Sequence, residues 1–177
     1  MSPRSLYIFD LDGTLADLKH RRHFVERPVI TCANCAFLHC EPSCRLCHTK
    51  HPFKPNWDAF HAACVGDKPI WPVIDVLRRL RISPFVDVWI WSGRMETVRK
   101  QTEDWLVDHI GKEFAHVLKM RPAGDYTPDD QLKESWLHAL PTADRARLMA
   151  VFDDRQRVVD MWRRNSVQCF QVAPGDF

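Results

Sequence analysis

Five short apolar runs constrain the fold of this chain more than any other feature of its sequence. They cover residues 6–9, 86–91, 116–120, 148–152 and 167–172. Runs of this length that are rich in β-branched and aromatic residues are typical of strands buried on both faces. The sequence therefore predicts five strands for a central sheet.

Helical patterns lie between these runs. Apolar side chains recur at spacings of three and four residues within 70–80, 98–110, 129–140 and 156–164. That spacing places apolar residues on one face of a helix. Strands that alternate with helices indicate a doubly wound parallel sheet, so the predicted fold class is α/β.

Length and composition exclude several classes of protein. The chain has 177 residues, of which 45% are hydrophobic and 27% charged, so we expect one globular domain over residues 1–177. The net charge of +2 is too small to indicate nucleic-acid binding by itself. No apolar run approaches the roughly 20 residues of a membrane span, and the first run is too short for a signal peptide. We therefore expect a cytoplasmic protein that does not bind membranes, and the sequence carries no signal for an oligomeric state.

Polar residues follow three of the predicted strands, at the sheet edge where ligands bind in open α/β folds. The sets are Asp10, Asp12, Gly13 and Thr14, then Ser92, Gly93 and Arg94, then Asp153 and Asp154. Carboxylates that converge at one edge repel one another unless a cation lies among them, and hard oxygen ligands suit Mg²⁺. The alternative is ordinary solvated turns, because Asp and Gly are common turn residues. Three such sets at successive strand ends favour a site.

The same residues resemble the motifs of the haloacid dehalogenase (HAD) superfamily. The segment 9–15 (FDLDGTL) is similar to its first motif, 92–94 to its second, Lys133 to its third, and Asp153–Asp154 to its fourth. A closer similarity, to the 3′-phosphatase domain of bacteriophage polynucleotide kinase-phosphatases, rests on residues 12–16, 121–133 and 153–177. No G-x-x-x-x-G-K-[ST] motif is present, so the sequence has no kinase half.

The resemblance implies a HAD-like Rossmannoid fold and a Mg²⁺-dependent phosphatase that works through a phospho-aspartyl intermediate. Asp10 would be the nucleophile, and Asp12 would be the general acid and then the general base. Ser92 would donate a hydrogen bond to a phosphoryl oxygen, and Lys133 would offset negative charge.

The resemblance also implies the ligands of the metal and of the substrate. Mg²⁺ would be held by Asp10, the main-chain carbonyl of Asp12, and Asp153 or Asp154. The expected ligands of the substrate phosphate are Thr14, Arg21, Gly93, Arg94 and Arg121. Without the resemblance, Arg21 could be part of a basic exposed turn, and Lys133 a surface lysine. Trp57 and Phe60 could close over the site or pack against the segment that precedes them.

A cysteine cluster interrupts the alternation of strands and helices. Five of the seven cysteines lie between residues 32 and 47, and Cys32, Cys35, Cys44 and Cys47 form two C-x₂-C pairs. Two such pairs match a tetrahedral, structural Zn²⁺ site. We interpret residues 28–55 as a small zinc-binding insertion after the first strand. The alternatives are reduced thiols, a disulfide, or a ligand set that includes His39, Cys40, His48 or His51. The isolated Cys64 and Cys169 are expected to be buried.

Three functions remain open at this stage. The first is a phosphatase that acts on 3′-phosphate ends of nucleic acids in end repair. The second is a (deoxy)nucleoside monophosphate phosphatase with the same chemistry, favoured by the missing kinase half. The third is a non-catalytic, zinc-stapled nucleic-acid-binding module, against which the intact set of Asp10, Asp12 and Lys133 argues.

We predict one zinc ion per chain, bound by Cys32, Cys35, Cys44 and Cys47. The segment has few apolar residues, so metal binding and local folding should be one equilibrium. A strong chelator should increase amide exchange first in residues 30–50 and leave the α/β core protected. Metal analysis that finds no zinc, with all four thiols alkylated under native conditions, would contradict this prediction.

Overall fold

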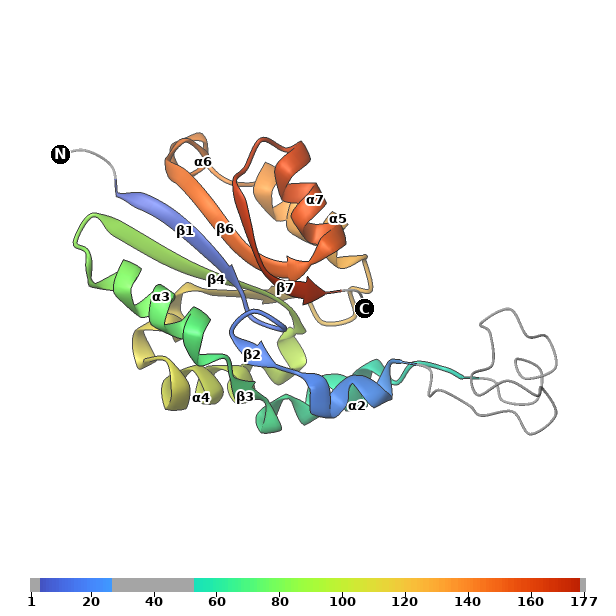
Figure 1. Cartoon of the computed structure of the whole chain (residues 1–177). Helices are drawn as coiled ribbons and strands as arrows, with labels where there is room; N and C mark the ends of the chain where they lie inside the picture. The colour runs from blue at the N-terminus through green and yellow to red at the C-terminus, as the bar shows by residue number, and fades with distance from the viewer. Residues whose placement is uncertain (1–3, 27–52, 176–177) are drawn as a thin grey trace.

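The computed structural model describes residues 4–26 and 53–175, which form a five-stranded parallel sheet with helices on both faces (Figure 1). The strands lie in the order β5-β4-β1-β6-β7, and each pairs in parallel with its neighbour. Their bounds are β1 Ser5–Asp10, β4 Val86–Met95, β5 Leu118–Arg121, β6 Leu148–Arg155 and β7 Cys169–Gly175. The predicted α/β fold class is confirmed.

The four predicted helices form and cover the two faces of the sheet. Helices α3 (Trp71–Ile82) and α4 (Arg99–His109) bury one core with the sheet, and α5 (Asp129–His138) and α7 (Gln156–Arg164) bury the other. Strand β1 serves both cores, because successive side chains point to opposite faces. Leu6 and Ile8 join the α5–α7 core, and Phe9 joins the α3–α4 core.

Short elements complete the described part of the chain. Strands β2 and β3 pair antiparallel and form a two-stranded ribbon that is separate from the main sheet. The bounds of the short elements are β2 Ala16–Asp17, η1 Lys19–Phe24, α2 Trp57–Ala62, η2 Ala63–Gly66, β3 Lys68–Pro69, η3 Glu96–Val98, η4 Lys112–Val117 and α6 Thr142–Arg147. No helix within these described residues is long and apolar enough to cross a membrane.

Strand boundaries differ from the sequence prediction at several places, as in β6, which continues to Arg155. Strand β4 continues to Met95, so the 92–94 motif lies inside the strand, where its pairing with β5 changes register between Ser92 and Met95. The third predicted strand begins later, at Leu118, because the preceding residues form the helical turns of η4, which bury Phe114. The fifth strand also begins later, because the main-chain nitrogen of Val167 donates to Trp162 at the end of α7.

The predicted zinc-binding insertion over residues 28–55 falls almost entirely on residues 27–52, outside the described ranges. It remains a prediction, as do its four cysteine ligands and the single domain over residues 1–177. The described residues on either side of it do meet: the main-chain nitrogen of Asn56 donates to the carbonyl of Phe24 at 2.8 Å. Phe24 and Asn56, on either side of that segment, therefore lie next to each other. Cys64 and Cys169 are buried and free, as expected.

Candidate active site

Three carboxylates meet where β1 and β6 end. Asp10 is the last residue of β1, and Asp153 and Asp154 lie near the end of β6, which pairs in parallel with β1. One oxygen of each carboxylate lies within 4.8 Å of the others, and all three residues are buried. The three carboxylates thus meet at one edge of the sheet, as the sequence predicted. Asp153 and Asp154 lie within the last residues of β6 and not after it.

The buried Lys133 of α5 supplies positive charge to this group. Its Nζ lies 2.7 Å from Asp10 Oδ1, 2.9 Å from Asp153 Oδ2 and 3.5 Å from an oxygen of Asp129. Burial would lower the pKa of the lysine, but the surrounding carboxylates outweigh burial and raise the pKa well above its usual range. Lys133 is therefore charged and buried, rather than a surface lysine.

The carboxylates carry more negative charge than Lys133 offsets. Burial raises the pKa of Asp10 well above its usual range against the lowering effect of Lys133, and burial with the charge of Asp153 raises the pKa of Asp154 to about 7. Three oxygen donors with excess negative charge fit a hard divalent cation such as Mg²⁺. Gly13 is required beside them: it has a φ of +87°, and a Cβ there would lie 2.1 Å from Asp154 Oδ2.

The side chain of Asp12 does not join this group, although the sequence predicted four converging carboxylates. Its Oδ1 accepts from Arg21 and Arg94, each at 2.6 Å. Burial would raise the pKa of Asp12, but Arg94 and Arg21 outweigh burial and hold this pKa well below its usual range. The two strand-end aspartates, Asp10 and Asp12, thus face different charges. The main-chain carbonyl of Asp12 remains the predicted metal contact.

A second buried aspartate, Asp67, completes the cluster around Asp12. It accepts from Nε and a terminal nitrogen of Arg21, both at 2.7 Å, and from Arg94. The side chains of both arginines and of Asp67 have no exposed surface. Two guanidinium groups and two carboxylates balance in charge, which is the condition for burying ions without a large cost.

Arg21 and Arg94 therefore lie beneath the pocket and not on its wall, although the sequence predicted both as ligands of the substrate phosphate. Each is already paired with two carboxylates, so a phosphate could bind them only by replacing a carboxylate oxygen. The interpretation of Arg21 as part of an exposed basic turn is wrong, because its side chain is fully buried. Its role toward phosphate remains a prediction.

The other predicted phosphate ligands differ in their access to the pocket. Gly93 and Arg121 line it. Ser92 is fully buried, and its Oγ accepts from the main-chain nitrogen of Arg94 at 3.2 Å. The buried Oγ1 of Thr14 has no hydrogen-bond partner among the described residues.

Arg121 uses most of its donors within the protein. Its Nε donates to the Gly93 carbonyl at 2.8 Å, one terminal nitrogen donates to the Thr127 carbonyl at 2.5 Å, and the other donates to Asp129 at 3.2 Å. These bonds hold the loop between β5 and α5 against β4. Arg121 therefore shapes the pocket wall, and only part of its guanidinium is free to meet a phosphate.

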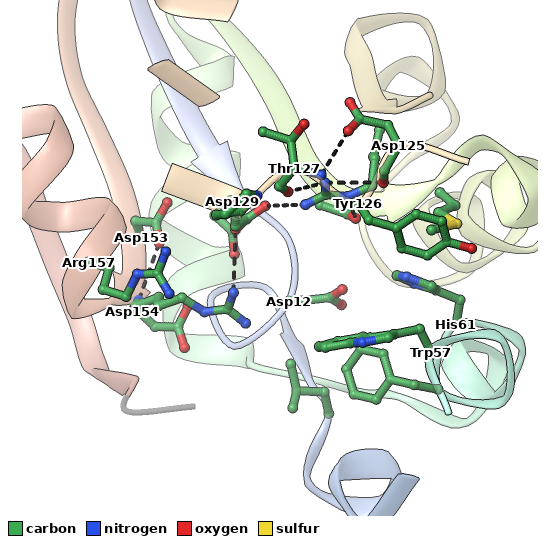
Figure 2. Close-up of a pocket in the computed structure, with 18 residues that line it drawn as sticks. Asp12, Trp57, His61, Asp125, Tyr126, Thr127, Asp129, Asp153, Asp154 and Arg157 are labelled. Atoms are coloured by element: carbon green, nitrogen blue, oxygen red, sulfur yellow. Dashed lines mark hydrogen bonds and ion pairs between the residues drawn. The ribbon is translucent and has the colours of Figure 1, made fainter. Parts of the chain in front are cut away.

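A cavity of about 380 Å³ opens above these groups (Figure 2). Asp153, Asp154 and Arg157 lie on one side of it, and Trp57, His61 and Tyr126 lie on the other, with Asp12 between them. A pocket with carboxylates at one end and aromatic rings at the other can hold a ligand that has both a phosphate and a flat apolar group. Trp57 and Phe60 line this pocket, so α2 borders the site.

Sequence reasoning missed several of these residues. Asp129 lies four positions before Lys133 on α5, so helical spacing could have placed both on one face. Asp67 gave no such signal, because it lies in a segment without a helical or strand pattern and far along the chain from its partners Arg21 and Arg94. His61 and Tyr126 reach the pocket from elements that only the tertiary fold brings together.

Residues 54–177 match a family model described as the polynucleotide kinase PNKP phosphatase domain. The match begins just before α2 and includes Lys133, Asp153 and Asp154, and it covers well over half of the chain.

Solved structures agree with this match. The chain resembles one in the structure of the Pnkp1/Rnl/Hen1 complex, with a TM-score of 0.68 and 28% identity over 100% of this chain and 48% of that chain. A chain in the Pnkp1/Rnl/Hen1 RNA repair complex gives 0.64 and 26% over 98% of this chain and 44% of that chain. This chain thus spans about half the length of either. The class C acid phosphatase from Bacillus anthracis shares the fold, with a TM-score of 0.57 and 12% identity over 98% of this chain and 68% of that chain.

We predict that Asp67→Asn lowers the free energy of unfolding by about 3 to 5 kcal/mol, because removal of one partner leaves buried charge uncompensated. Urea unfolding measures this change. Asp75→Asn is the matched control: it removes the same charge from an exposed ion pair with Arg79 and should change stability little. Equal stability of the two variants would contradict the prediction.

Proposed function

This chain belongs to the family of polynucleotide kinase PNKP phosphatase domains, and on that basis we propose that it removes phosphate from the 3′ ends of nucleic acids. It is an HAD-type phosphatase domain, related in structure to Pnkp1. Family membership does not specify the substrate, the position of its phosphate or the role of each residue, and these are what we propose.

The observation that carries the proposal is the environment of Asp10. Its carboxylate lines the pocket, accepts from Lys133 at 2.7 Å and lies with Asp153 and Asp154 at the edge of the sheet. A carboxylate at the open end of a pocket can reach the phosphorus of a bound phosphate. The lysine beside it can offset the charge that gathers as the two anions meet.

In the first half of the reaction, an oxygen of Asp10 forms a bond to phosphorus as the bond to the sugar 3′ oxygen breaks. The leaving oxygen takes a proton from the Asp12 carboxyl. Arg21 and Arg94 favour the ionised form of Asp12, so this step needs a substrate that draws at least one arginine away from it. A phosphate can do so, because guanidinium groups bind phosphate oxygens with paired hydrogen bonds.

In the second half, water attacks the phosphorus of the phospho-aspartyl group and passes a proton to the Asp12 carboxylate. The bond between phosphorus and Asp10 breaks, which gives inorganic phosphate and a free Asp10. The two arginine contacts of Asp12 support this half directly, because they favour the ionised carboxylate that accepts the proton.

The residues that would hold Mg²⁺ are Asp10, Asp153 and Asp154 through their side chains and Asp12 through its main chain. When bound, the cation would offset the charge between the Asp10 carboxylate and the phosphate. Lys133 fixes the orientation of Asp10 and Asp153 in either case, because it donates to both. Ser92 is proposed to donate to a phosphoryl oxygen.

Nucleic-acid ends are the favoured substrate for two reasons. Pnkp1, about half of which is similar to this chain, occurs in an RNA repair complex. The pocket also holds an aromatic side next to its carboxylate side, so it suits a phosphate attached to a nucleoside. Phosphate release from 3′-phosphorylated oligonucleotides, compared with 3′- and 5′-mononucleotides, tests the proposal. A preference for mononucleotides would identify a nucleotidase instead.

We predict that Asp10→Asn reduces turnover of a 3′-phosphorylated oligonucleotide at least about 1,000-fold, because the attacking charge is lost. The fold should persist, since Lys133 keeps its contact with Asp153 at 2.9 Å. Rapid acid quench should trap a hydroxylamine-labile phosphoryl group on the parent chain and not on the variant. Asp104→Asn, on the exposed face of α4, is the control. Near-normal turnover by Asp10→Asn would rule out the covalent mechanism.

We predict that Asp12→Asn slows substrates with poor leaving groups more than substrates with good ones. Release of a sugar alkoxide needs a proton, whereas release of p-nitrophenolate needs little. The turnover number for the substrate with the sugar leaving group, divided by that for p-nitrophenyl phosphate, should fall about 100-fold, the usual size of a general-acid contribution. Equal losses for both substrates would leave Asp12 without a role in the first step.

A further inference from the structure

We propose that Trp57, His61 and Tyr126 bind the nucleoside of the terminal nucleotide, with its base packed against the ring of Trp57. The three residues are called here the aromatic wall. This inference rests on the proposed function, since it assigns the part of the substrate that the carboxylate end of the pocket does not hold. No role was assigned to His61 or Tyr126 on the basis of the sequence.

The first support is the position of the aromatic wall relative to the reacting groups. All three residues line the same cavity as Asp10 and Asp12, on the side opposite Asp153 and Asp154 (Figure 2). A phosphate seated at the carboxylates therefore directs the group attached to it toward these rings. Base stacking on aromatic side chains is tolerant of sequence, as an enzyme that acts on any 3′ end requires.

The second support is the rigid mounting of Trp57. Asn56 caps α2 by accepting from the main-chain nitrogen of Ala59 at 3.0 Å. Phe60 lies over the buried Arg21, whose Cζ is 4.2 Å from the ring centroid, and Phe60 meets Trp57 edge-on at 5.7 Å. Phe60 thus supports the Trp57 side chain, which lines the pocket and remains 43% exposed. A fixed aromatic face loses little freedom when a base stacks on it.

The third support is the state of His61. Burial, together with the charges of Arg21, Arg121 and Arg94, lowers its pKa to about 4 against the raising effect of Asp12. The imidazole is therefore neutral at physiological pH. Its buried Nδ1 has no partner among the described residues, and the residue lines the pocket, so the neutral ring is a candidate hydrogen-bonding partner for a sugar hydroxyl or a base edge.

The fourth support is the placement of Tyr126 and the space beyond it. The Arg121 bonds to its loop, together with the 2.8 Å bond from the Thr127 nitrogen to Asp125, fix the loop that carries Tyr126. A second hollow of about 500 Å³ shares Trp57 and Tyr126 with the main cavity and continues to Lys54 and Asn56. The aromatic wall therefore has room beyond it for the next nucleotide, which a mononucleotide would leave empty.

The test compares two 3′-phosphorylated oligonucleotides that differ only in whether the terminal nucleotide carries a base. For Trp57→Ala we expect KM for the base-bearing substrate to rise about 5- to 150-fold, the range for loss of one stacked base, with kcat nearly unchanged. The abasic substrate should be affected little. Trp57→Phe should restore most of the loss, and Tyr126→Ala should act in the same direction as Trp57→Ala.

Trp71→Ala is the matched control, because Trp71 is also half-exposed but lies on α3, away from the cavity. It should change neither substrate. Hydrolysis of acetyl phosphate, which has no nucleoside, reports the chemistry separately and should be the same in all the tryptophan and tyrosine variants.

Two results would overturn the inference in different ways. Equal KM values for the base-bearing and abasic substrates in the parent chain would exclude the aromatic wall and leave the proposed function intact. Hydrolysis of acetyl phosphate without hydrolysis of any 3′-phosphorylated oligonucleotide would reject the proposed function, and the inference with it.

Discussion

The ion pairs of Lys133 are the interaction on which the rest of the site depends. Parallel strands that end side by side bring Asp10, Asp153 and Asp154 together, and their mutual repulsion opposes this arrangement. The lysine offsets part of that repulsion from a fully buried position on α5. Because α5 also packs against the sheet through Leu132 and Trp136, the hydrophobic core and the charge balance support the same helix position.

A second charge balance separates the roles of two neighbouring aspartates. Asp10 faces one lysine and two other carboxylates, whereas Asp12 faces two arginines that are themselves held by Asp67. Burial raises the pKa of Asp10 against the lowering effect of Lys133, whereas Arg94 and Arg21 outweigh burial and lower the pKa of Asp12. Two carboxyl groups in such different environments can take different parts in one reaction. The proposed role of Asp10 rests on its place beside Lys133, Asp153 and Asp154, and the proposed role of Asp12 rests on its separation from that group.

The aromatic side of the pocket depends on the same buried arginines. Arg21 pairs with Asp12 and Asp67 through its nitrogens and supports Phe60 through the face of its guanidinium. The packing of α2, which carries Trp57 and His61, is therefore coupled to the buried cluster of Arg21, Asp12 and Asp67. Arg121 connects the opposite loop to β4 in a similar way. Two arginines predicted as phosphate ligands thus hold the parts of the fold that line the cavity, Arg21 from beneath and Arg121 at the wall.

The sequence by itself determined the α/β class, the four long helices and the aspartates at the strand ends, because these follow from local periodicity and from the rule that parallel strands end at one edge. It also placed Lys133 in the site through its resemblance to a known motif. Only the tertiary structure decided the partners of Arg21 and Arg94, the role of Asp67 and the aromatic wall. The physical reason is that these contacts join residues such as Asp12 and Arg94, or Arg21 and Asp67, whose distance in space is set by how helices and loops pack on the sheet. No local pattern encodes that distance, and the compensation of buried charge becomes visible only when the partners have met.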